Sequence, residues 1–237
     1  AHNILNPANG APITVPAQDM VLGLYYITKL RKGAKGEGLT FYGPEEALIA
    51  YNEGKVDIHA IINVVAKDLD ENGNIVDKMI KETSVGRVIV NEIVPAEVGY
   101  LNTIISKKSL RDIISDVIKA VGVARACEFL DGIKNLGYKM AFEGGLSFNL
   151  GDIIIPKEKE ELVKRGHEEI EQIMMNYNMG FITDNERYNQ VIDTWTHVNS
   201  DLSDILYKTI KNDDQGFNSV FMMLDSGARG SKEQIRQ

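Results

Sequence analysis

The stretch 180-GFITDNERYNQVIDTW-195 decides the architecture of the second half of the chain. Thr183 and Glu186 precede a periodic apolar run at the spacing of a capping box, which marks the start of a helix. The run continues to about residue 212 at steps of three and four, through Tyr188, Val191, Ile192, Trp195, Val198, Leu202, Ile205 and Leu206. The stretch therefore predicts a long helix with a narrow apolar stripe.

The segment just before it, 157-KEKEELVKRGHEEIEQIMMNYN-178, predicts a second long helix that begins after Pro156. Its stripe consists of Leu162, Val163, Ile170, Ile173, Met174 and Tyr177. Two such helices with a short connector predict an antiparallel coiled-coil hairpin over residues 156–212. Its tip would be the turn at 179–182, where Met179 and Phe181 would be exposed. The hairpin is either a scaffold arm or a docking surface, and the apolar tip favours docking.

The first half of the chain mixes strands and helices. Residues 1–45 are rich in turns and include the apolar run 19-DMVLGLYYITKL-30. A short helix is expected in 43–54, and strands are expected over 56–95. Residues 106–145 predict two helices, separated at Gly122 and ended by paired glycines. We therefore predict an α+β fold with a mixed domain at 1–150 and a helical-hairpin domain at 151–237.

The segment 68-DLDENGN-74 admits two interpretations. Asp68, Asp70, Asn72 and Gly73 match the opening of a calcium-binding loop. The closing ligand of such a loop is a glutamate, and that position holds Met79. Asn-Gly between two apolar runs is also a strong hairpin signal. A hairpin turn is the favoured prediction.

Composition excludes several classes of protein. The chain has 237 residues, 43% hydrophobic, with a net charge of −8. That acidic balance disfavours a free-standing nucleic-acid-binding protein. No apolar run approaches the ~20 residues of a membrane span, and no secretory signal is visible. The one cysteine, Cys127, fits a reducing compartment, so we predict a cytoplasmic protein without membrane contact.

No catalytic or metal-binding set is recognisable. The four histidines lack a second histidine at ligand spacing, and Cys127 has no activating neighbour in the sequence. A small magnesium- or nucleotide-dependent enzyme therefore lacks its expected ligands. The segment 225-DSGARGS-231 precedes a short helix, where backbone N–H groups and Arg229 could face an anion. The same sequence is also consistent with an ordinary helix N-cap followed by a surface arginine.

Four segments together resemble one known family. These segments are 3-NILNPANGAPITVPAQDMVLGLYYITK-29, 83-TSVGRVIVNEIVP-95, 180-GFITDNERYNQVIDTW-195 and 217-FNSVFMMLDSGARGSKEQIRQ-237. They resemble the beta-prime subunits of bacterial DNA-directed RNA polymerase, in the same order and over almost the whole chain. The resemblance implies an internal piece of a much longer subunit.

The resemblance also implies a function. Residues 1–150 would form the pore, or secondary channel, through which nucleotides enter, and residues 151–237 the funnel with its rim helices. RNA synthesis, a nucleotidyl transfer with Mg²⁺, would belong to the whole enzyme only. The chain itself would hold no metal, no catalytic residue and no other cofactor. Its partners would be the other polymerase subunits, channel-binding transcription factors and, after assembly, nucleotides, DNA and RNA.

Individual roles follow from the family's motifs. The nucleotide channel would be lined by Gln18, Asp19, Met223 and Arg229. The factor-docking surface would consist of Met179, Phe181, Glu186, Arg187, Tyr188, Asn189, Gln190 and Asp193. Relatives that bind an alarmone nucleotide carry a basic residue where this chain has Gln190, so we do not expect alarmone binding. The alternative function is a free-standing coiled-coil adaptor.

Overall fold

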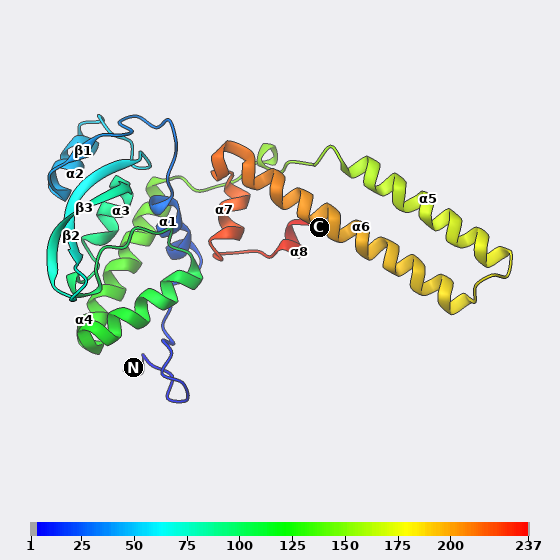
Figure 1. The fold of residues 1–237 in the computed structure, drawn as a ribbon, viewed down its shortest axis with the longest axis horizontal. Helices are drawn as coiled ribbons and strands as arrows, with labels where there is room; N and C mark the ends of the chain where they lie inside the picture. Colours follow the sequence, from blue (N-terminus) through cyan, green and yellow to red (C-terminus); the bar gives the residue numbers. More distant parts are fainter. Residues whose placement is uncertain (1–3, 237) are drawn as a thin grey trace. The chain divides into compact units, whose positions relative to one another are not determined.

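A computed structural model gives the fold of residues 4–236 (Figure 1). His2 and Asn3 lie outside these residues. The main elements are α1 (Asp19–Thr28), β1 (Thr40–Phe41), α2 (Pro44–Asn52), β2 (Ile62–Leu69), β3 (Ile75–Thr83), α3 (Val85–Asn91), α4 (Lys107–Glu143), α5 (Lys159–Asn178), α6 (Asp184–Asn212), α7 (Ser219–Asp225) and α8 (Lys232–Arg236). The predicted α+β class is confirmed.

The chain divides into two compact units. The first contains the residues up to Ser147 together with Met222–Arg229, and the second contains Phe148–Phe221 and the residues from Gly230 onward. The segment Met222–Arg229 thus returns to the first unit after the long hairpin. The pore and funnel roles of residues 1–150 and 151–237 stay predictions.

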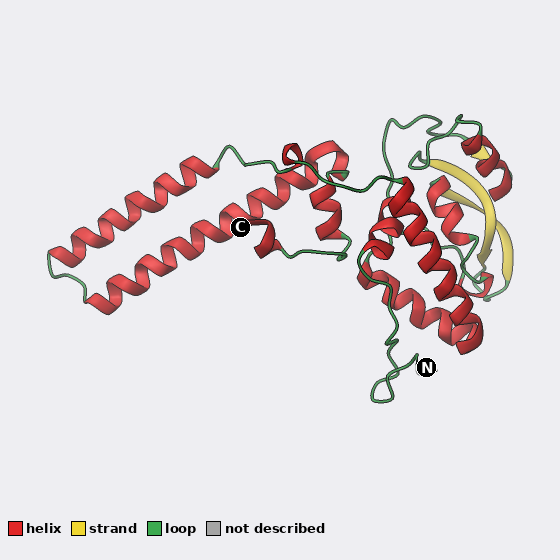
Figure 2. Ribbon diagram, turned by 180° about the vertical axis from the view of Figure 1, so that it is seen from behind, coloured by secondary structure: helices red, strands yellow, loops and turns green. Residues whose placement is uncertain are grey.

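A three-stranded sheet in the order β1-β2-β3 lies in the first unit. Strands β2 and β3 form an antiparallel hairpin that curves past α3 (Figure 2). The Asp70 carboxylate accepts the backbone N–H groups of Asn72 and Asn74, at 2.8 and 2.7 Å. Gly73 supplies the left-handed residue of the turn, with φ of 80°. The predicted hairpin turn is confirmed.

The predicted strand over the end of 56–95 is wrong, because Val85–Asn91 forms helix α3. Ser84 caps this helix by accepting the N–H of Arg87 at 3.2 Å. A Cβ on Gly86 would lie 1.9 Å from the carbonyl oxygen of Ile27, so α3 packs directly on the backbone of α1. The cap and this close contact outweigh the strand preference of the β-branched residues.

Helix α1 is buried along most of its length, so its sequence lacks the periodic polar residues by which a helix is predicted. The residues Val21, Leu22, Leu24, Tyr25 and Ile27 are all buried, so no polar face marks a helical period. A Cβ on Gly23 would lie 2.0 Å from the carbonyl oxygen of Gly137 in α4. The two helices therefore touch backbone to backbone.

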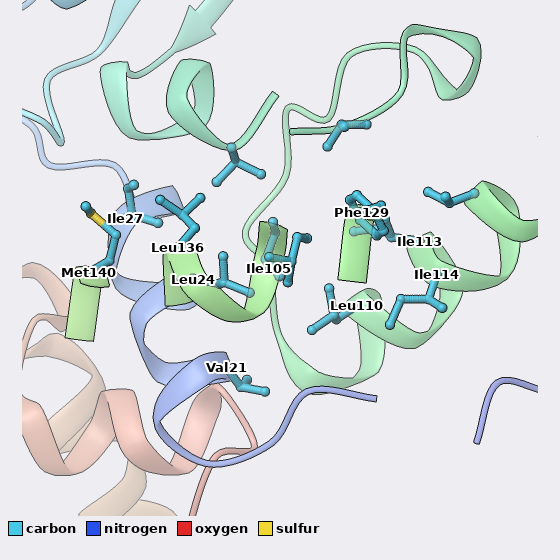
Figure 3. Packing of buried hydrophobic residues seen from close by; sticks show 14 of the residues in the cluster. Val21, Leu24, Ile27, Ile105, Leu110, Ile113, Ile114, Phe129, Leu136 and Met140 are labelled. Atoms are coloured by element: carbon cyan, nitrogen blue, oxygen red, sulfur yellow. The ribbon is translucent and has the colours of Figure 1, made fainter. Parts of the chain in front are cut away.

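Helix α4 completes the main core. It bends at Gly122, whose φ is 77°, and its helical geometry ends at Gly144, as predicted. Leu110, Ile113, Ile114 and Val117 of its first half are buried with Phe129, Ile133, Leu136 and Met140 of its second half. Figure 3 shows Leu24 and Ile27 of α1 directed toward Leu136. Apolar burial of this extent is the principal stabilising contribution to the first unit.

Arg87 joins α3 to its neighbours from a buried position. Its guanidinium donates to the carbonyl of Thr28 at 2.9 Å and to the carbonyl and side chain of Asn102 at 3.0 and 2.8 Å. Burial lowers the pKa of Arg87 from its ordinary value. Because its donors are used by buried acceptors, Arg87 fixes the loop after η1 (Ala96–Val98) to the end of α1.

The second unit is dominated by α5 and α6, which run antiparallel and are joined by a short turn (Figures 1 and 2). This confirms the predicted helical hairpin. A Cβ on Gly166 of α5 would lie 3.1 Å from Val198 and 3.3 Å from Trp195 of α6. The rings of His167 and Trp195 meet edge to face, with centroids 5.1 Å apart. The small residue therefore brings the helices together at the one tryptophan.

Candidate functional site

The tip of the hairpin is a compact, exposed turn. The N–H groups of Gly180 and Phe181 donate to the carbonyls of Tyr177 and Asn176, at 2.9 and 3.0 Å. Gly180 has φ of 76°, which a glycine adopts without strain. Met179 and Phe181 are 64% and 74% exposed. The turn thus presents two large apolar side chains to solvent, as expected.

The first turn of α6 carries a complete capping box. Thr183 accepts the N–H of Glu186 at 3.3 Å, and the Glu186 carboxylate accepts the N–H and hydroxyl of Thr183 at 2.7 and 2.9 Å. The backbone N–H of Thr183, followed by its hydroxyl, lowers the pKa of Glu186 from its ordinary value. Glu186 is therefore held in place as an anion next to the tip.

Arg187 is also held in place. Its Nε and Nη2 donate to Oδ1 of Asp184 at 3.0 and 2.7 Å. Its guanidinium lies 5.2 Å from the ring centroid of Tyr177 in α5. These contacts link the last turn of α5 to the first turn of α6, so the positive charge at the tip has a defined position.

The next turn of α6 adds the remaining predicted docking residues. Tyr188, Asn189, Gln190 and Asp193 are all exposed. Tyr188 and Ile192, also exposed, are four residues apart and share one face of the helix. The structure therefore gathers the predicted docking residues over the turn and the first three turns of α6.

The predicted nucleotide-channel residues belong to the first unit. In the return segment, the N–H of Arg229 donates to the carbonyl of Met223 at 3.2 Å. Met223 is half-buried, whereas Arg229 is exposed. The turn that joins them contains Gly227, with φ of 71°, and Gly230 follows, with φ of 91°. Arg229 is therefore displayed on a tight turn rather than on a regular helix.

Two contacts anchor that turn to the helical core. The hydroxyl of Tyr25 in α1 donates to Oδ2 of Asp225 at 2.7 Å, and the N–H of Lys107 donates to the carbonyl of Ser226 at 2.9 Å. Ser226 is fully buried. These anchors were not predicted from the sequence. The polar Tyr25 within an almost wholly apolar run is the one signal that could have revealed them, because a buried tyrosine hydroxyl needs a partner.

Gln18 and Asp19 lie at the start of α1 and are exposed. Gln18 has φ of 52°, a left-handed conformation that is unusual for a residue other than glycine. Strained backbone of this kind is often found at functional positions. Among residues 4–236, no hydrogen bond or ion pair joins Gln18 or Asp19 to Met223 or Arg229. The structure places these residues in one unit without linking them directly.

The described part of the chain shows no group of three or more His, Cys, Asp or Glu side chains arranged around a metal position. Within residues 4–236, no helix combines the length and apolarity needed to cross a membrane.

Comparison with known proteins gives the family. Residues 3–153 match the family model described as RNA polymerase Rpb1, domain 3, and residues 182–237 match the one described as RNA polymerase Rpb1, domain 4. The whole chain is 95% identical to the DNA-directed RNA polymerase subunit beta' of Phocaeicola vulgatus, over 17% of that subunit. The chain belongs to the family of bacterial RNA polymerase beta' subunits.

Other beta' relatives agree over the same span. The identity is 86% to the subunit of Bacteroides fragilis and 56% to that of Flavobacterium johnsoniae, and all of this chain is covered in both. The chain spans about one sixth of the length of these curated relatives, 16% and 17% respectively. The predicted family is confirmed. The individual roles of the channel and docking residues stay predictions.

Proposed function

We propose that this chain forms part of the wall of the nucleotide-entry channel of a bacterial RNA polymerase, and that its hairpin is the docking site for transcription factors that enter this channel. Membership of the beta' family supports the first half of the proposal. RNA synthesis, with its magnesium ions, DNA, RNA and partner subunits, is then a property of the assembled enzyme. The 237-residue chain alone is expected to make no RNA.

One observation carries the docking half of the proposal: the distal hairpin combines fixed polar groups with exposed apolar ones. Glu186 and Arg187 are held by the cap and by Asp184, and Tyr188, Met179 and Phe181 stand exposed nearby. Ordered charges surrounding aromatic and methionine side chains are typical of protein-binding surfaces. A long arm that served only as a spacer would not need an exposed apolar end.

The nucleotide-facing role rests on Arg229. A planar guanidinium binds phosphate oxygens in a bidentate manner. The anchored turn leaves the Arg229 side chain exposed to solvent. Gln18, Asp19 and Met223 would line the same channel wall in the assembled enzyme. The alternative function, a free-standing adaptor, is less well supported, since these relatives are RNA polymerase subunits.

A single experiment tests both halves with two variants of the full-length subunit, each assembled into whole polymerase. Tyr188→Ala removes a docking side chain and is expected to weaken binding of a channel factor about tenfold, roughly 1.4 kcal/mol. Its KM for nucleotides should match wild type. Arg229→Ala is expected to raise the KM for nucleotides about tenfold or more and to leave factor affinity unchanged.

Each variant is thus the control for the other. Equal factor binding by Tyr188→Ala and wild-type polymerase would contradict docking on the hairpin. An unchanged nucleotide KM in Arg229→Ala would contradict the channel role. A variant that reduced both readouts would indicate a general defect in assembly and would support neither assignment.

A further inference from the structure

Strand β2 has an edge that is only partly paired. Strand β1 pairs with it at Thr40↔Asn63 and Phe41↔Val64 and then ends, while β2 continues to Leu69. The N–H of Asn63 donates toward β1, to the carbonyl of Leu39 at 2.9 Å. Because backbone groups alternate along a strand, those of Lys67 point to the same side. No strand of residues 4–236 lies beside β2 there.

A groove lies along this open edge. Its volume is about 480 Å³, and the sheet contributes Val65–Lys67 of β2 and Asp77 of β3 to its lining. Tyr42 and Glu45, where the chain leaves β1 and enters α2, form one wall. Pro44 and Val65, both partly exposed, supply apolar lining, whereas Val88 and Val94 belong to the buried core and are only 1% and 7% exposed. The groove therefore combines an unpaired strand edge with an apolar surface, the two features by which a sheet edge accepts an extended peptide.

The charges of the groove favour a basic ligand. Glu45, Asp77 and Glu92 are among the lining residues, against the single positive charge of Lys67. In the described part of the chain, neither Glu45 nor Glu92 forms an ion pair. Two unpaired carboxylates next to an apolar surface match a peptide that carries a lysine or arginine beside an apolar residue.

We propose that an extended segment of the remaining beta' polypeptide adds to β2 in this groove, along the line that β1 begins. Its backbone would bond to the carbonyl of Val65 and to both backbone groups of Lys67. An apolar side chain would lie against Pro44 and Val65, and a basic one would reach Glu45 and Glu92. The segment would come from the same subunit, because the chain spans only 17% of its relative from P. vulgatus.

A peptide fits this site better than a small molecule does. A strand bonds to a row of backbone groups along an open sheet edge at once, whereas a small molecule can bond to only one or two of them. The proposal goes beyond the channel function, because none of the residues assigned to nucleotides or factors lines the groove.

The test uses whole polymerase assembled with full-length beta'. Tyr42 is 86% exposed and lines the groove, so a photo-reactive p-benzoylphenylalanine in its place reports the occupant. After irradiation and digestion, mass spectrometry should find one predominant cross-linked peptide from beta' sequence outside this chain, with a lysine or arginine in it. Cross-links only to another subunit or to nucleic acid, or no cross-link at all, would overturn the proposal.

A charge reversal tests the specific contact. Glu45→Lys, combined with the photo-probe, should reduce the cross-link yield about fivefold, because it places like charges together. Glu71→Lys is the matched control, since Glu71 is exposed in the β2–β3 turn and does not line the groove. An equal yield in the two variants would refute the basic contact.

Hydrogen exchange gives an independent readout without a substitution. In whole polymerase, an added strand should protect the amide of Lys67 as strongly as the amide of Ala66, which faces β3. Rapid exchange at Lys67 beside slow exchange at Ala66 would show an open edge and overturn strand addition.

Discussion

At the scale of single residues, the first unit depends on positions where a side chain would not fit. Gly23 and Gly137 allow α1 and α4 to touch, and Gly86 allows α3 to touch α1. The sequence does not distinguish these glycines from those of the turns, because the close contact is made by residues far apart in the chain. Their effect is strong since a Cβ would stand 2.5 Å or less from a carbonyl oxygen.

Gly23→Ala is therefore expected to destabilise the first unit by about 3 kcal/mol, because the helices must separate to admit the methyl group. The gain in helix propensity, about 1 kcal/mol, offsets only part of this cost. Urea unfolding followed by far-UV circular dichroism measures the difference in the free energy of unfolding.

The matched control is Gly43→Ala. Gly43 has φ of −168°, and a Cβ there would meet nothing within 4 Å. Its free energy of unfolding should stay within about 1 kcal/mol of that of the wild type, since Gly43 is the N-cap of α2 and alanine caps a helix less well than glycine. If Gly23→Ala were as stable as Gly43→Ala, the backbone contact between α1 and α4 would not be a determinant of stability.

Tyr100 gives a prediction about alkaline pH. Burial raises its pKa from 10.0 to about 12, and its hydroxyl shares a 3.0 Å hydrogen bond with Thr83. Above pH 10 the unfolded chain loses the Tyr100 proton, whereas the folded protein keeps it until about pH 12. The contribution of Tyr100 to the free energy of unfolding is complete below pH 10 and is lost as the pH rises toward 12. The loss is on the order of 2 kcal/mol.

Tyr100→Phe should remove this pH-dependent contribution to stability. The variant is expected to be about 1 kcal/mol less stable at pH 8, because the bond to Thr83 is lost, but to lose less stability between pH 10 and 12. Urea midpoints across this range measure both effects. Tyr42→Phe is the control, because it removes the hydroxyl of an exposed tyrosine and should leave the pH dependence of the urea midpoint unchanged. Parallel pH profiles for the two variants would contradict the assignment to Tyr100.

At the scale of elements, the sequence predicted those helices whose stabilising signals are local. The cap of α6, the stripes of α5 and α6, the turn at Gly73 and the break at Gly122 all depend on residues close together in the chain. Helix α3 was predicted as a strand, and α1 was left unassigned. Both depend on contacts between distant segments, which no local pattern records.

The same distinction applies to the candidate sites. The tip and its charged residues could be predicted because they follow the helical period of α6. The anchoring of the Arg229 turn could not, because Asp225 and its partner Tyr25 are 200 residues apart. The groove beside β2 was missed for a related reason: it exists only where a two-residue strand stops short of its neighbour.

Thr183→Ala tests whether the cap orders the proposed docking surface. Loss of the threonine hydroxyl removes the bond to the N–H of Glu186 and should destabilise the hairpin by about 1 kcal/mol. The variant should fray first around Glu186 and Arg187, seen as faster amide exchange there. Thr196→Ala, an exposed position inside α6, is the control. Equal exchange in both variants would show that the cap does not hold this turn.

At the scale of the whole molecule, the chain shows surface that a larger assembly would cover. Phe142, at the end of α4, is 87% exposed. In the segment before α5, Leu150 and Ile155 are 88% and 68% exposed. Large apolar side chains that gather within a few residues indicate contact surfaces rather than chance exposure. Since the beta' relatives are about six times longer, such surface is expected to face the rest of the subunit or its partners.

In isolation, the 237-residue chain should therefore self-associate as its concentration rises, because burial of these side chains against a second copy removes apolar area from water. Light scattering should show an average mass that grows with concentration. The double variant Leu150→Ser with Ile155→Ser should stay monomeric at higher concentration than wild type. Ile49→Ser, which removes an exposed isoleucine of α2, should change little. A wild-type chain that is monomeric up to its solubility limit would contradict this account, because the apolar segment would then be tolerated in water.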